Sequence, residues 1–245
     1  MTITARRPAP LLAAQPDTDR VARVTGLLFL VTYVTSIPAA FYFYTPVTDH
    51  PGYLLGAGAD QRVLWGAFLE VILVLANIGT AVTLFPVLKR QHEGLALGFV
   101  TARVMESVFI SVGILSVLTL VSLRQDASGA GDVDSAALAT VGDALVTLKQ
   151  WTFDLGPGFI VGVGNGVILG CLLYRSGLVP RGMAVLGLVG GPLVCLSGAA
   201  VVLGVIESGS SWQLVASVPE FFWELSLGVY LLVKGFRPAP ILAAS

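Results

Sequence analysis

Six long apolar stretches, separated by short polar segments, follow one another along the chain. A helix needs about 20 mostly apolar residues to cross the roughly 30 Å hydrocarbon core of a bilayer. The six stretches reach this length and are apolar on every side, whereas the strands of a membrane β-barrel are short and alternate. The pattern therefore predicts an all-α, polytopic membrane bundle with six transmembrane helices. We place these at residues 21–44, 63–88, 95–123, 152–174, 182–206 and 214–233.

The polar segments complete the expected domain organisation. Residues 1–20 hold three prolines among small and charged residues, which predicts a disordered N-terminal tail. Residues 21–237 form the six-helix domain, and residues 238–245 form a C-terminal tail. The longest connection, 124–150, starts as a Gly- and Asp-rich loop and continues as a helix-compatible stretch, 136–148. That stretch either lies on the membrane surface or extends the fourth span.

Composition agrees with a membrane protein and excludes other classes. Apolar residues make up 55% of the 245 residues and charged residues 12%. Soluble proteins carry about 25% charged residues. So few charges exclude an ordinary soluble enzyme, a disordered chain and a nucleic-acid binder, which needs a basic surface. The partner that we expect is the lipid bilayer, with no nucleic acid.

Lysine and arginine are divided unevenly between the two ends of the expected spans. Ten lie at one end, namely Arg6, Arg7, Arg20, Arg23, Lys89, Arg90, Arg175, Arg181, Lys234 and Arg237, and three lie at the other, namely Arg62, Arg124 and Lys149. Cytoplasmic segments carry the excess of positive charge. We therefore expect both termini in the cytoplasm, and the even number of spans independently puts them on one side.

Four glycines of the fourth span, Gly158, Gly162, Gly166 and Gly170, recur at four-residue spacing. They make a smooth stripe along which another helix can approach closely. We expect tight packing within the bundle, with a homodimer through the same stripe as the alternative. Asn165 lies beside the stripe and can hydrogen-bond across it.

Five ionisable residues lie well inside the apolar stretches: Glu70, Arg103, Glu106, Glu220 and Glu224. A charge at the bilayer centre costs at least about 2.5–3.5 kcal/mol on insertion scales. These residues therefore need partners, water or protonation. At a rise of 1.5 Å per residue, Glu106 falls near the midplane of the bilayer and Arg103 falls on its cytoplasmic side. The other three residues lie in the outer half of the bilayer.

The spacing of these residues places them on three polar helix faces. The two glutamates of the sixth span are four residues apart and share a face. Arg103 and Glu106 are three apart, which is close enough for an ion pair. Asn77 lies seven residues after Glu70, again on one face. Because lipid cannot solvate such faces, we expect them to converge inside the bundle.

Four carboxylates against one guanidinium leave an excess of negative charge. Desolvation and like-charge repulsion both favour the neutral carboxylic acid. We predict that at least one carboxyl, in the pair Glu220 and Glu224, is protonated near neutral pH. A protonated carboxylic acid in an apolar site is a potential proton donor. The structural alternative is a buried polar network that fixes helix register.

Five segments of the chain carry a recognisable pattern, which includes ARVMES at 102–107 and PEFFWELSLG at 219–228. They resemble a family of bacterial integral membrane proteins known as domain of unknown function 4386. The resemblance runs from about residue 20 to residue 237 and implies a polytopic protein of the bacterial plasma (inner) membrane. It implies no activity, cofactor or catalytic residue. The five segments are 67–90, 96–116, 151–166, 173–181 and 219–236.

The first functional hypothesis is a membrane-embedded acid–base enzyme acting on a hydrophobic substrate, a lipid or an isoprenoid. Glu220 or Glu224 exchanges the proton, while Glu70 and Glu106 stabilise positive charge or act as base. Arg103 modulates Glu106 or holds an anionic head group. The residue types fit because intramembrane ionisable groups are by default candidates for function.

Three further polar residues are candidates for substrate binding beside Arg103: Asn77, Asp154 and Asn165. Asp154 has a structural alternative as the N-cap of the fourth span. The histidines and cysteines lack the spacing of a metal site, and phosphate-binding and dinucleotide motifs are missing. We therefore expect no metal and no cofactor. The competing hypotheses are a proton-coupled transporter or channel and a non-catalytic membrane partner.

Overall fold

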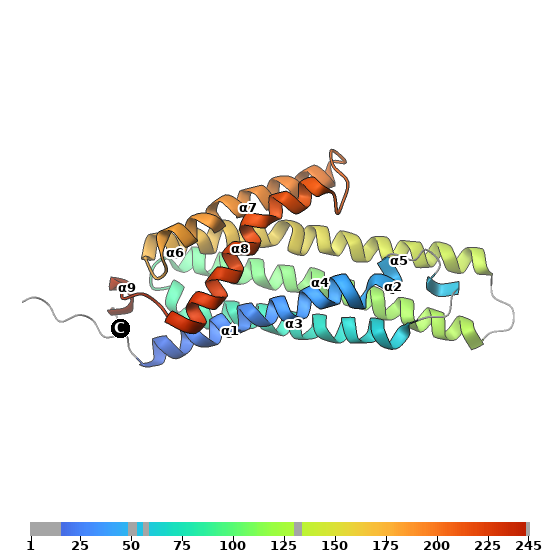
Figure 1. Ribbon diagram of the computed structural model, residues 1–245, viewed down its shortest axis with the longest axis horizontal. Coiled ribbons are helices and arrows are strands. Elements are labelled where there is room, and N and C mark those ends of the chain that lie inside the picture. Colours follow the sequence, from blue (N-terminus) through green and yellow to red (C-terminus); the bar gives the residue numbers. More distant parts are fainter. Residues whose placement is uncertain (1–15, 49–52, 56–58, 130–133, 244–245) are drawn as a thin grey trace, which may run out of the picture.

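The computed structural model describes residues 16–48, 53–55, 59–129 and 134–243. The described part of the chain is almost entirely helical, and six helical segments in it are long and apolar enough to cross a membrane. The predicted all-α bundle with six spans is therefore confirmed (Figure 1).

The six spans follow the chain in order. The first three are α1 (Pro16–Pro38) with η1 (Ala39–Phe43), α3 (Asp60–Leu88) and α4 (Glu93–Gly129). The fourth is a continuous run of α5 (Ser135–Leu155), η3 (Gly156–Ile160), η4 (Gly162–Leu169) and α6 (Gly170–Ser176). The last two are α7 (Arg181–Val202) and α8 (Ser211–Lys234), and the short segments are α2 (Thr45–Thr48), η2 (Tyr53–Leu55) and α9 (Pro240–Ala243).

The spans form a closed ring in which each packs against the next. α1 contacts α3, α3 contacts α4, and α4 contacts the fourth span along α5, η3 and η4. η4 contacts α7, α7 contacts α8, and α8 returns to pack against α1, crossing the bundle obliquely in Figure 1. Side chains on the inner faces of this ring are shielded from lipid, so the interior can hold polar groups.

The N-terminal boundary differs from the predicted one. α1 begins at Pro16, so residues 16–20 of the predicted tail are helical, while residues 1–15 lie outside the described part of the chain. Proline suits a first helical turn because its missing N–H would have no partner there. Asp17 and Asp19 place negative charge at the positive end of the helix dipole.

The predicted C-terminal tail, 238–245, also contains structure. Its residues Pro240–Ala243 form α9, and Leu242 is buried in the apolar core at this end of the bundle. The backbone N–H of Arg237 donates to the carbonyl oxygen of Leu178 at 2.8 Å, which fixes the segment beside the α6–α7 connection. Burial therefore orders a segment whose composition suggested a tail.

The connection after the third span is much shorter than the predicted 124–150. α4 continues to Gly129, and α5 begins at Ser135, capped by Asp134, whose carboxylate accepts hydrogen bonds from two backbone N–H groups of the first turn. The stretch 136–148 therefore extends the fourth span. α4 and α5 pack together here, and burial of their facing side chains stabilises helix where composition suggested a loop.

Two π-helical segments, η3 and η4, occupy the middle of the fourth span. Pro157 has no backbone N–H to donate to the preceding turn, so the regular α-helical pattern cannot continue through it. π-Helical segments are rare and often lie at functional sites. Because η4 carries Asn165, this candidate residue sits on a widened part of the helix.

The glycine stripe of the fourth span packs against α7 of the same chain. A Cβ atom added to Gly166 would lie 2.3 Å from the Cα of Gly191, and one added to Gly162 would lie 2.6 Å from the Gly191 carbonyl oxygen. Gly158 and Gly170 also contact α7. The predicted tight packing is confirmed. Association of two copies through the stripe stays a prediction, and it would require α7 to move aside.

The largest apolar core among the described residues lies at the end of the bundle where α1 begins and α9 ends. Leu84, Leu88, Phe99, Leu172 and Leu173 are fully buried there. The core also includes residues of α7 and α8, so all six spans contribute to it. Tightly packed apolar side chains therefore fill the ring interior at this end.

Candidate functional site

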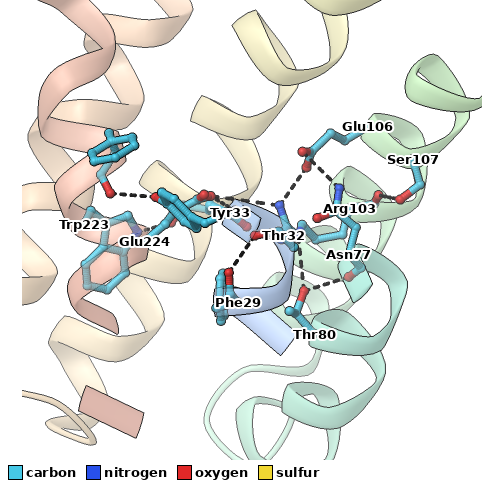
Figure 2. A network of polar contacts seen from close by, with 12 residues as sticks. Phe29, Thr32, Tyr33, Asn77, Thr80, Arg103, Glu106, Ser107, Trp223 and Glu224 are labelled. Atoms are coloured by element: carbon cyan, nitrogen blue, oxygen red, sulfur yellow. Dashed lines mark hydrogen bonds and ion pairs between the residues drawn. The ribbon is translucent and has the colours of Figure 1, made fainter. Parts of the chain in front are cut away.

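Six polar side chains from four elements meet in the ring interior, and we call them the Arg103 cluster. They are Asn77 and Thr80 on α3, Arg103 and Glu106 on α4, Asn165 on η4 and Glu224 on α8. Figure 2 shows the α3 and α4 residues on one side and Glu224 on the other. The contacts therefore join residues from opposite sides of the ring.

Arg103 and Glu106 form a buried ion pair on α4. Nη1 of Arg103 lies 2.8 Å from Oε2 of Glu106, which confirms the predicted pairing. Asn77 donates to Oε1 of Glu106 at 3.2 Å, and Nε of Arg103 donates to Oγ1 of Thr80 at 3.3 Å. The guanidinium carbon also lies 5.5 Å from the ring centroid of Phe29. Partners from α3 and α1 therefore fix the direction of both charged side chains.

Glu224 is the second carboxylate of the cluster and reaches it from α8. Its Oε1 lies 4.0 Å from Nη1 of Arg103 and accepts a hydrogen bond from the side-chain amide of Asn165. Its side chain is 14% exposed, against 2% for Arg103. Tyr33 of α1 lies beside it in Figure 2, with its ring centroid 5.1 Å from that of Phe221. Glu224 is therefore the most accessible group of the cluster, at the seam between α1 and α8.

The backbone of Asn165 is tied to α8 by a buried tryptophan. The indole N–H of Trp223 donates to the carbonyl oxygen of Asn165 at 3.0 Å. The indole packs against α7 at Gly187, where an added Cβ would lie 2.6 Å from Nε1. This contact holds η4 against α8 next to Glu224, so the amide of Asn165 meets the carboxylate.

Glu220 lies one turn before Glu224 on the same face of α8, in a different environment. It is 4% exposed, and Oε2 packs against the backbones of Gly166 and Gly190. Neither carboxylate oxygen has a hydrogen-bond donor among the residues that the structure describes. The two glutamates of the predicted pair therefore differ, because Glu224 has polar partners within the described chain and Glu220 is packed among glycines.

Glu70 does not join the cluster, so the expected convergence of all three polar faces is wrong for this residue. Both of its oxygens lie 2.7 Å from Nζ of Lys149, and Oε2 accepts a hydrogen bond from the Tyr44 hydroxyl at 2.8 Å. Seven residues separate Glu70 from Asn77, which is about 10 Å along a helix. That distance allows each to find partners on different elements.

Asp154 is buried near the end of α5, where its polar contacts are separate from the Arg103 cluster and from the Glu70–Lys149 pair. Gln213 of α8 donates to its Oδ1 at 3.1 Å, and Gln150 donates to its Oδ2 at 3.5 Å. The alternative role of Asp154 as a helix cap is wrong, because Asp134 caps the helix that contains it. The contact with Gln213 ties the fourth span to α8 at a point separate from the Arg103 cluster.

Several residues that contact the candidates were not predicted. Thr80 follows Asn77 by three residues, so helical spacing was a usable signal for it. Trp223 gave no polar signal, because a tryptophan within an apolar stretch is typical of a core. Lys149 was assigned to a connection, since only the extension of the fourth span by α5 brings it beside Glu70.

Proton exchange is the chemistry that this arrangement can perform. The described residues contain no group of three or more His, Cys, Asp or Glu side chains placed to hold a metal ion. Arg103 lies beside two carboxylates, and Glu220 adds a third within a helical turn. Buried carboxyl groups can donate or accept protons, and a guanidinium can stabilise an anion held next to it.

Comparisons with known proteins address the family. The search of curated proteins and the search of solved structures each found no match. Residues 24–235, which include the Arg103 cluster and Glu220, match the family described as Domain of unknown function (DUF4386). The predicted resemblance is thus confirmed over nearly the whole chain, and the protein belongs to the DUF4386 family.

Proposed function

We propose that the protein is a membrane-embedded acid–base enzyme that acts on a hydrophobic substrate, a lipid or an isoprenoid, at the Arg103 cluster. The observation that carries the proposal is the partial exposure of Glu224 between α1 and α8, with the rest of the cluster buried behind it. A substrate that diffuses within the bilayer reaches a group at this seam without crossing an aqueous phase.

The packing on the two sides of the cluster supports lateral entry. Toward the end of the bundle that holds α9, the interior is filled by apolar side chains such as Leu84 and Phe99. At the seam, Phe221 and Phe222 are exposed on the surface of α8 and would contact lipid. The first feature closes the bundle axis at the α9 end, and the second places lipid beside the seam, so both favour access from the membrane over access from that end.

The roles follow from the contacts of each side chain. Glu224 exchanges the proton, because it is the carboxylate that a substrate can touch. Arg103 stabilises the ionised form of Glu224 or an anionic head group held beside it. Glu106 positions the guanidinium and is itself held by the amide of Asn77. Glu70 is a weaker candidate, because Lys149 and Tyr44 already satisfy it.

We also propose that both termini face the cytoplasm and that the membrane is the bacterial inner membrane. The start of α1 and the end of α9 lie at the same end of the bundle (Figure 1). Most lysines and arginines outside the spans belong to this end, and positive charge favours the cytoplasmic side.

Exchange of the carboxyl for an amide tests the enzyme proposal. Wild type, Glu224→Gln and Glu207→Gln are reconstituted in nanodiscs made from a bacterial total lipid extract, and the lipids are compared by mass spectrometry over time. Glu207 is exposed in the connection before α8, so its variant is a control for the same chemical change. We expect one lipid to be consumed and one to appear with wild type and the control, and neither change with Glu224→Gln. Identical lipid profiles in wild type and Glu224→Gln would refute the proposal.

Proton-coupled transport is the second candidate, and the buried carboxyl of Glu220 favours it. A transporter needs carboxyls that bind and release protons within the membrane. Liposomes with an internal pH-sensitive dye would show proton uptake under a pH gradient. Uptake by wild type and Glu207→Gln, lost in Glu224→Gln without any lipid conversion, would favour transport over the enzyme.

A further inference from the structure

The carboxyl of Glu220 is buried in a place that does not suit a charge. It is 4% exposed, and a Cβ atom added to Gly166 or Gly190 would lie 2.7 or 2.9 Å from its Oε2. Neither of its oxygens meets a hydrogen-bond donor in the described chain. An ionised carboxylate in such surroundings carries a large desolvation penalty, whereas a neutral acid carries a much smaller one.

A second unsatisfied group lies on the neighbouring part of the fourth span. Oδ1 of Asn165 is buried and has no hydrogen-bond donor among the described residues, although Nδ2 of the same amide donates to Glu224. Asn165 immediately precedes Gly166, whose backbone touches Glu220. An amide oxygen accepts hydrogen bonds, and a carboxylic acid has one O–H to donate.

We propose that Glu220 is a proton-binding site whose carboxylic acid donates to Oδ1 of Asn165, so that Asn165 bridges a neutral Glu220 and an ionised Glu224. One hydrogen bond then gives a partner to Oδ1 of Asn165 and to the protonated oxygen of Glu220. The amide is asymmetric: its N–H stabilises the charged carboxylate, and its oxygen stabilises the protonated one. Asn165 is therefore a positioning residue that decides which of the two carboxyls holds the proton.

The charges around the pair agree with this assignment. Arg103 reaches from α4 to Glu224 with its Nη1 at 4.0 Å, so the positive charge favours ionisation of that residue. Glu106 and Glu224 present negative charge to Glu220 and Arg103 presents positive charge, while Tyr33 of α1 and Cys195 of α7 are the other titratable groups near it among the described residues. The ion-pair contacts of Arg103 go to Glu106 and Glu224, so two carboxylates face Glu220 against one cation that is already paired. Like charges disfavour a further carboxylate, and the proton therefore belongs on Glu220.

This inference deepens the proposed function. It rests on that function only for the role of the Glu220 proton in catalysis. In the enzyme, Glu224 is the group that the substrate touches, and Glu220 holds a proton one helical turn away. The structural assignment itself concerns the resting protein, so it can be tested without a substrate.

Infrared spectroscopy of the purified protein in nanodiscs tests the assignment, because a protonated carboxyl has a C=O stretching band separate from those of carboxylates and amides. We expect this band in wild type, in Glu207→Gln and in Glu224→Gln, and its loss in Glu220→Gln. In Asn165→Leu the N–H donor to Glu224 is removed, so we expect a second acid band, and a shift of the Glu220 band as its acceptor disappears. Helical circular dichroism and size-exclusion profiles verify that each variant is folded.

Each other outcome counts against the proposal. A band that persists in Glu220→Gln, or that disappears in Glu224→Gln, would put the proton elsewhere. An unchanged spectrum in Asn165→Leu would overturn the bridge. Glutamine is nearly isosteric with the neutral acid, so failure of Glu220→Gln to fold would also contradict a neutral Glu220. Loss of the band in Glu220→Gln, together with identical lipid profiles in wild type and Glu224→Gln, would refute the proposed enzyme and leave the proton-binding site supported.

Discussion

Removal of the Arg103 guanidinium tests whether the cluster is held by its ion pairs. In Arg103→Gln, Glu106 loses a partner at 2.8 Å and Glu224 loses one at 4.0 Å. Removing one member of a buried ion pair costs about 3–5 kcal/mol, because the other charge is left uncompensated. Glu106 keeps its hydrogen bond from Asn77 and can take up a proton, so we expect the lower end, about 3 kcal/mol.

Variants of Glu106, alone and together with Arg103, should show a defined order of destabilisation. In Glu106→Gln, Arg103 still faces Glu224, so we expect a smaller loss of about 2 kcal/mol, the range for a hydrogen bond to a charged group. The double variant Arg103→Gln/Glu106→Gln leaves no unpaired charge between these two positions. It should therefore be less destabilised than the sum of the single variants, with a coupling of about 1–3 kcal/mol.

Unfolding in mixed micelles with increasing sodium dodecyl sulphate, followed by circular dichroism, measures these differences. Arg124→Gln is the matched control, because Arg124 pairs with Asp60 near the end of the bundle, where both side chains are 16% exposed. Because these two side chains are less buried than Arg103 and Glu106, water can solvate the charge left behind, and we expect a smaller loss than in Arg103→Gln. A loss in Arg103→Gln no larger than in this control, or strictly additive losses in the double variant, would refute the reasoning.

Two further predictions concern packing and the second ion pair, both measured by the same unfolding assay. Gly191→Ala should destabilise the protein by at least about 1–3 kcal/mol, because its Cβ would lie 2.5 Å from the carbonyl oxygen of Gly162. The control Gly182→Ala should not destabilise it, because a Cβ there meets nothing within 4 Å. Equal losses in the two variants would contradict the role of the stripe. Lys149→Met should cost about 3 kcal/mol, because it leaves Glu70 without an opposite charge. Adding Glu70→Gln to this variant should recover part of that loss. No recovery would mean that the ion pair does not stabilise the fold.

The spans were predictable because each depends on its own residues. Apolar length over about 20 residues determines that a segment crosses the bilayer as a helix. The boundaries outside the membrane were less predictable, since α9 and the first part of α5 are ordered by burial against other helices. Leu242 packs into a core built from distant segments, and such contacts leave no local signal.

The candidate site was predictable in part for the same reason. Arg103 and Glu106 are three residues apart on one helix, so their ion pair follows from helical geometry. Asn165 was visible as a polar residue beside a glycine stripe. Its contact with Glu224 joins residues 59 positions apart, and nothing in the spacing predicts that contact.

The sequence by itself determined the number of spans, the ionisable residues that lie within them and the pairs that share a helical face, and it predicts the orientation of the spans. These properties follow from hydropathy, charge and the helical repeat, which act locally along the chain. The tertiary structure decided which faces meet. It paired Glu70 with Lys149, gave Glu224 the partners Asn165 and Arg103, and left Glu220 among glycines. The physical reason is the closed ring, in which backbone approach at the glycine stripe and packing between distant helices fix the partner of each buried charge.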